Sequence, residues 1–98
     1  MPSEKQSKNH RIKEHRKQIN EIDNQILKLL KERFEISKKV GKYKKQNNLS
    51  IKNKKREKQL LEKNKNRAKG FNLKSGFVEK LFRLILKESR KIQKLNKK

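Results

Sequence analysis

The sequence contains no cysteine, and it has one proline and three glycines among 98 residues. Without cysteine, the chain cannot be held together by disulfides and has no thiol nucleophile. The single proline is Pro2, so no proline ring interrupts a helix in the rest of the chain. We therefore expect long, uninterrupted helices.

Long apolar runs and aromatic residues are also scarce. No segment is apolar enough to cross a membrane or to serve as the hydrophobic part of a signal peptide, so we expect a cytoplasmic protein without a membrane partner. Four Phe and one Tyr offer no stacking platform for nucleic-acid bases. No glycine-rich phosphate loop is present. His10 and His15 do not share a helical face as zinc ligands would, so no metal or cofactor is expected.

Acidic residues are few, and the balance of charge is strongly basic. Ten Asp and Glu stand against 32 Lys and Arg, which gives a formal net charge of +22. Such a charge permits binding to nucleic-acid phosphates. However, 25 Lys, 10 Asn and 8 Ile are also what a coding bias toward A and T produces on solvated faces. The second explanation is favoured, and nucleic acid is a less favoured partner.

The hydrophobic residues that are present follow helical periodicity. Leu, Ile, Val and Phe total 25 of 98 residues, above the level of about one fifth that is typical of disordered chains. A chain this short buries little core by itself, and a long helix with one apolar face usually finds a partner. We expect a single all-α domain that forms an oligomer.

Three helices account for most of the chain. The first begins near His10 to Lys13 and runs to about Gln46, followed by turn residues 47–50. The second is capped by Asn53 and stops near Ala68, with Gly70 as its C-terminal cap. The third begins between residues 72 and 75 and runs to about Leu95. This organisation predicts a basic, disordered tail over residues 1–12, a helical domain over 13–95 and a short tail over 96–98.

The apolar stripe of the first helix carries two permanent cations, Arg33 and Lys44. At ~100° per residue both fall in the middle of a sector of roughly 120°. Six aliphatic residues define that sector: Ile22, Ile26, Leu29, Leu30, Ile36 and Val40, counted from Ile19. An unpaired buried cation costs several kcal/mol, and no carboxylate clearly shares the stripe. A bound anion is therefore a candidate partner.

Polar residues also fall on the inward faces of the other two helices. Ser89 lies in the apolar sector of the third helix, beside Val78, Leu81, Phe82, Ile85 and Ile92, and Gln93 borders the sector four residues later. Leu60 and Leu61 face inward on the second helix. The first turn of that helix carries Lys54, Lys55 and Arg56, where the macrodipole disfavours cations. Singly, each has a structural explanation, but together the inward residues outline a polar pocket.

These residues, in this order, resemble the all-helical chorismate mutases of the AroQ class. The resemblance covers Arg16 to Gln93 without a gap and includes the segments RKQINEIDNQILKLLKERFEISKKVGKYKKQ, NKKREKQLLEK and KLFRLILKESRKIQ. It implies an intertwined homodimer of three-helix subunits. It also implies the rearrangement of chorismate to prephenate, a unimolecular step of aromatic amino acid biosynthesis that needs no nucleophile, metal or general base.

The resemblance assigns roles to eight residues. Arg33 and the Arg16 of a second copy would clamp the two substrate carboxylates, because guanidinium forks bind carboxylates bidentately. Lys44 and Gln93 would donate to the ether oxygen of the breaking bond, where charge develops. Glu57 would accept a hydrogen bond from the substrate hydroxyl, and Arg56 would add positive field beside it. Ser89 would contact a substrate carboxylate. Asn53 would cap the second helix and offer its backbone amide to the hydroxyl.

Helical geometry agrees with a site shared between two copies. Arg33 and Lys44 are eleven residues apart, ~16 Å along a helix, so two long side chains can converge on one small ligand. Arg16 lies a further ~25 Å back and cannot easily reach that ligand from the same chain, but it can from an antiparallel copy. Asn53 departs from the family pattern, which usually has aspartate there, and we expect reduced or altered activity rather than loss.

Two other functions remain open at this point. A helical nucleic-acid-binding or scaffold protein would make Arg33 and Lys44 incidental. An enzyme of the same fold that eliminates pyruvate from isochorismate is poorly excluded by the sequence, since a fold does not fix the chemistry.

Overall fold

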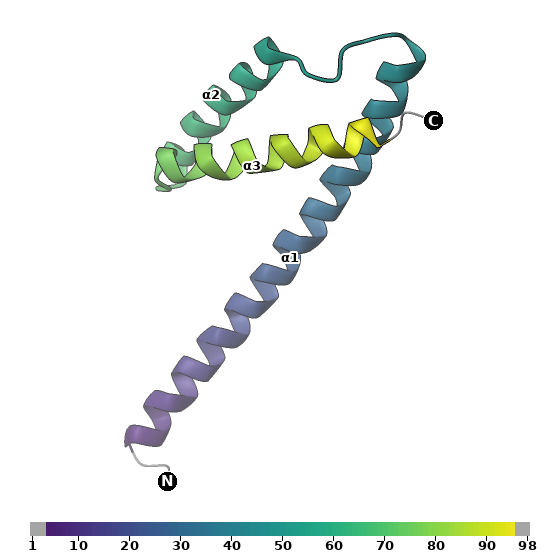
Figure 1. The fold of residues 1–98 in the computed structure, drawn as a ribbon. Coiled ribbons are helices and arrows are strands. Elements are labelled where there is room, and N and C mark those ends of the chain that lie inside the picture. Colours follow the sequence, from purple (N-terminus) through teal and green to yellow (C-terminus); the bar gives the residue numbers. More distant parts are fainter. Residues whose placement is uncertain (1–3, 96–98) are drawn as a thin grey trace. The chain divides into compact units, whose positions relative to one another are not determined.

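The computed structural model describes residues 4–95, with the side chains of residues 8–95, and the regular structure in this range is entirely helical (Figure 1). Helix α1 spans Glu4–Gln46, α2 spans Lys54–Gly70 and α3 spans Ser75–Lys94. The expected all-α chain with a long, a short and a medium helix is confirmed. None of these helices has a stretch long and apolar enough to span a bilayer.

The first helix begins earlier than the sequence predicts. It starts at Glu4 rather than between His10 and Lys13. Between Glu4 and Lys13 there is no glycine or proline, and lysine, glutamate and glutamine have good helix propensity. No residue in this segment therefore prevents the helix from beginning at Glu4. Residues 4–12 are therefore helical where a disordered tail was expected. Residues 1–3 and 96–98 of the expected tails lie outside the described residues.

The chain divides into two compact units, residues 1–33 and 34–98. The described part of the first unit is the amino-terminal portion of α1. Its apolar stripe is uncovered, with Ile19 55%, Ile26 50% and Leu29 62% exposed. Exposed aliphatic groups at helical spacing are typical of a surface that packs against another chain.

The second unit consists of the last turns of α1 together with α2 and α3, and its core lies largely between α2 and α3, which contact each other. The turn after α2 brings its end next to the start of α3 (Figure 1). Five apolar residues are buried: Leu61, Ala68, Val78, Ile85 and Leu86. Leu61, Val78 and Ile85 were expected to face inward. Leu81 was expected as well, but it is 40% exposed. The buried face of α3 is therefore rotated toward Leu86.

Helices α1 and α2 end in the same way, with an asparagine in the left-handed conformation. Asn48 has φ 54° and Asn72 has φ 57°. After α2, the Leu73 amide donates to the Ala68 carbonyl at 2.8 Å and the Asn72 amide donates to the Lys69 carbonyl at 3.1 Å, which is a Schellman motif. The same pair of bonds closes α1. The prediction that Gly70 caps α2 is wrong, because Gly70 remains inside the helix and Asn72 makes the turn.

The start of α2 follows the sequence prediction. Asn53 is extended, with φ −121° and ψ 93°, and its side-chain oxygen accepts a hydrogen bond from the Arg56 amide at 3.0 Å. This bond satisfies one of the amides that a helix leaves unpaired at its first turn. Helix α3 begins after Lys74, which makes no side-chain cap.

Candidate active site

Lys44 and Gln93 line the same cavity in the second unit. The cavity has a volume of about 260 Å³ and lies between the end of α1, the loop after it and the end of α3. Lys44 Nζ donates to the Ile51 carbonyl at 2.8 Å, which fixes the direction of the side chain. An ammonium group has three N–H donors, so this bond leaves two for other acceptors.

Gln93 presents an unsatisfied polar atom. Its Oε1 is buried and has no hydrogen-bond partner. Since an unpaired buried oxygen costs about 1–3 kcal/mol, such atoms in folded proteins generally mark a place where a water or a ligand binds. Gln93 also lines the cavity of Lys44, so two donor-bearing side chains expected at one ligand are brought together.

Helix α1 approaches Gln93 closely at Gly41. A Cβ atom built on Gly41 would lie 2.8 Å from Gln93 Cα and 3.0 Å from its carbonyl oxygen. Those distances are too short for any side chain. Gly41 therefore permits the backbone contact that holds Gln93 at the wall of the cavity.

Ser89 is buried one turn before Gln93. It is 4% exposed, and its Oγ accepts a hydrogen bond of 3.3 Å from Ser37 Oγ on α1, which is itself 8% exposed. Ser37 and Gly41 are four residues apart, as are Ser89 and Gln93. Small side chains on α1 thus face the expected site residues of α3 along one contact line. By helical spacing Ser37 lies on the apolar stripe of α1, and this position could have indicated from the sequence that Ser37 is buried.

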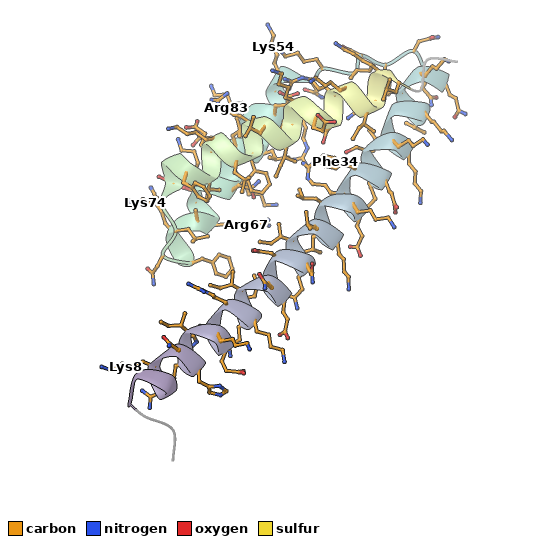
Figure 2. All side chains as sticks on the ribbon, turned by 60° about the horizontal axis from the view of Figure 1, so that its bottom comes forward. Lys8, Phe34, Lys54, Arg67, Lys74 and Arg83 are labelled. Carbon is orange, nitrogen blue, oxygen red and sulfur yellow. The ribbon has the colours of Figure 1, made fainter. Side chains whose placement is uncertain are left out.

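Glu57 is held by a residue that sequence reasoning missed. Arg90 Nη1 donates to Glu57 Oε1 at 2.6 Å, and the two side chains are 25% and 19% exposed. Glu57 lines a cavity of about 150 Å³ together with Arg90, and another of about 320 Å³ whose wall includes Lys54 and Arg83, both labelled in Figure 2. Arg90 directly follows Ser89, so it borders the inward face of α3, but on a chain of +22 charge one more arginine gave no signal of a role.

The other expected site residues lie outside these cavities. Asn53 and Arg56 are joined by the cap at the start of α2, and the Arg56 side chain is exposed. Arg16 is exposed and Arg33 is half-buried, and both lie on α1 within the first unit. Their participation in a site remains a prediction.

The arrangement supplies cationic and neutral hydrogen-bond donors together with one carboxylate. Lys44 and Gln93 present an ammonium group and an amide to one cavity, and Glu57 presents an acceptor elsewhere in the unit. Donors of this kind stabilise negative charge that develops on a bound molecule. This arrangement fits the binding of an anionic substrate in a fixed conformation.

Comparison with known proteins identifies the family. The bifunctional chorismate mutase/prephenate dehydratase of Buchnera aphidicola subsp. Acyrthosiphon pisum is 43% identical over 79 residues, covering 81% of this chain and 20% of that protein. The chain thus spans about a fifth of this relative. The chorismate mutase of Methanocaldococcus jannaschii is 33% identical over 84 residues, covering 86% of this chain and 85% of that protein. The profile of chorismate mutase type II matches residues 15–94, and the chain belongs to this family.

Proposed function

We propose that the chain rearranges chorismate to prephenate. The observation that carries this proposal is the shared cavity of Lys44 and Gln93, with Lys44 Nζ anchored on a carbonyl. Family membership and a relative named chorismate mutase, of which the chain covers 85%, support the same activity.

The reaction breaks a carbon–oxygen bond and forms a carbon–carbon bond within one molecule. It needs no covalent intermediate, so catalysis consists of holding a compact conformer and stabilising charge on the ether oxygen. Lys44 and Gln93 Nε2 donate to that oxygen. Because Ile51 already orients Lys44, little reorganisation is needed when the charge develops.

The remaining residues bind the ends of the substrate. Arg33 clamps one carboxylate and Arg16 of a second copy clamps the other, with Ser89 contacting a carboxylate as well. Glu57 accepts a hydrogen bond from the substrate hydroxyl, and Arg56 adds positive field beside it. A dianion is attracted electrostatically to this group of cations.

Asn53 has a double role in this proposal. It caps α2 through its side chain, and its backbone amide is offered to the substrate hydroxyl. Most relatives are expected to carry aspartate here. The amide side chain preserves the cap without adding a negative charge near a dianionic substrate.

The active form is a homodimer in this proposal. The uncovered aliphatic stripe on α1 supplies an apolar surface for a second copy, and burial of each such side chain is worth about 1.5–3 kcal/mol.

Incubation of the purified chain with chorismate and, separately, with isochorismate tests the function. Loss of chorismate with formation of prephenate supports the proposal. Pyruvate released from isochorismate would instead assign the lyase reaction. Salt-sensitive binding of nucleic acid without turnover of either substrate would favour a binding protein, for which the +22 charge is the relevant observation. The cytoplasmic location expected from the sequence stays a prediction.

A further inference from the structure

The ion pair between Glu57 and Arg90 connects the two helices that form the core of the second unit. Glu57 lies in the first turn of α2, and Arg90 lies in the last part of α3, 33 residues later. The contact is 2.6 Å long and both side chains are largely shielded from solvent. A charge-assisted bond of this length, with limited exposure, holds both groups in defined positions.

Glu57 has several cations around it, but Arg90 is the one that contacts it among the described residues. The cavity of about 150 Å³ beside the pair is lined by one carboxylate and three cationic side chains: Glu57, Lys52, Arg83 and Arg90. Arg83 is engaged elsewhere, since its Nη2 donates to Glu79 Oε1 at 3.1 Å. The pairing of Glu57 with Arg90 is therefore specific, and not merely a result of high charge density.

A carboxylate is a difficult residue to place beside a dianionic substrate. Glu57 is useful as an acceptor for a hydroxyl group, but its own negative charge repels the two substrate carboxylates across a partly desolvated site. A cation bonded to one carboxylate oxygen removes most of that repulsion. The second oxygen remains available to accept the hydroxyl, because an ionised carboxylate has acceptor sites on both oxygens.

We propose that Arg90 is a positioning residue for Glu57, which fixes the carboxylate through Oε1 and neutralises it toward an anionic substrate. The inference rests on the proposed function and adds a residue that the expected site did not include. Arg90 acts through Glu57 and does not touch the substrate. Its effect falls on binding, because the repulsion it removes acts on the ground state and the transition state alike.

Steady-state kinetics of three single variants test this role in the full chain. We expect Arg90→Met to raise KM about tenfold while kcat changes less than about threefold. Arg90→Lys keeps the charge, so its KM should stay within about threefold of the wild-type value. Arg83→Met is the matched control from the same helix and the same cavity, and its KM should change by no more than about twofold.

A double-mutant cycle separates positioning from a structural role. In a Glu57→Gln background there is no carboxylate charge to neutralise, so Arg90→Met should then change KM by less than about twofold. An equal rise in both backgrounds would overturn the proposal, as would a lysine variant as impaired as the methionine variant. Circular dichroism checks helix content, and the lysine variant keeps the test valid where the methionine variant loses helix.

Failure of the proposed function gives a different result. A wild-type chain that does not convert chorismate would refute both the activity and the role of Arg90 in it. A wild-type chain that is active, with an Arg90→Met variant of unchanged KM, would refute the role of Arg90 alone.

Discussion

Replacing Gly41 by alanine would place a methyl group against the backbone of α3. The added Cβ would lie 2.8 Å from Gln93 Cα, whereas ordinary carbon contacts begin near 3.4 Å, so the two helices must separate by about 0.6 Å. The neighbouring atoms belong to backbone and Cβ and cannot rotate away. Overpacking of this kind costs about 1–3 kcal/mol, and the better helix propensity of alanine returns up to about 1 kcal/mol.

We therefore expect Gly41→Ala to lower the free energy of unfolding by about 1–2 kcal/mol, which corresponds to a fall in Tm of about 4–16 °C for a domain of this size. Thermal unfolding followed by circular dichroism, at one protein concentration for all variants, measures the change. Displacement of Gln93 should also reduce kcat by about tenfold, because a misplacement near 1 Å costs up to about a hundredfold.

Gly76→Ala is the matched control on α3. A Cβ at Gly76 meets nothing within 4 Å, so alanine adds helix propensity without a clash. This variant should gain about 0.5 kcal/mol of stability and keep full activity. If Gly41→Ala proves as stable and as active as Gly76→Ala, the close approach at Gln93 does not exist in solution and the reasoning is refuted.

Three further predictions concern the cavity and the start of α2. Lys44→Ala should reduce kcat by about 10²–10³-fold with helix content unchanged, and a loss of less than about fivefold would remove Lys44 from the reacting oxygen. Gln93→Glu should confine activity to acidic pH, because a carboxyl group donates only when protonated; kcat should fall about tenfold for each pH unit above the pKa of the new carboxyl, and a flat profile would contradict the assignment. Asn53→Ala should cost about 1 kcal/mol in urea unfolding, whereas Asn53→Asp should not, and equal stability of all three proteins would show that the cap is unimportant.

The helices were predictable where local rules decide. Helix α1 ends at Gln46, Asn53 caps α2 and α3 begins at Ser75, all as apolar periodicity and cap chemistry indicate. The end of α2 was not predictable, because two residues suit a left-handed turn there. Glycine is the preferred residue, but Gly70 competes with a nearby asparagine that can also adopt the left-handed conformation. Asn72 takes that position once Leu73 bonds back to the Ala68 carbonyl, a geometry that sequence preference alone does not fix.

The candidate site was predictable in part for a related reason. Lys44 lies on an apolar stripe and Gln93 borders one, and the family resemblance assigned both to the same substrate oxygen. Arg90 lies at the edge of such a pattern on a chain of +22 charge, where an additional arginine carries no signal, and its partner lies 33 residues away. Which face of α3 is buried depends on its packing partner, so Leu86 rather than Leu81 enters the core.

The two asparagine turns, after α1 and after α2, are positions at which the sequence does not have the most stabilising residue. Asn48 and Asn72 occupy a conformation that costs a residue with a side chain more than it costs glycine, and neither is among the residues assigned to the substrate. Each is thus a place where selection has accepted a less favourable residue, as is common in proteins that need only exceed a stability threshold. Asn48 lines the cavity of Lys44 and Gln93 and Asn72 does not, so stability could be raised at the end of α2 without altering the wall of that cavity.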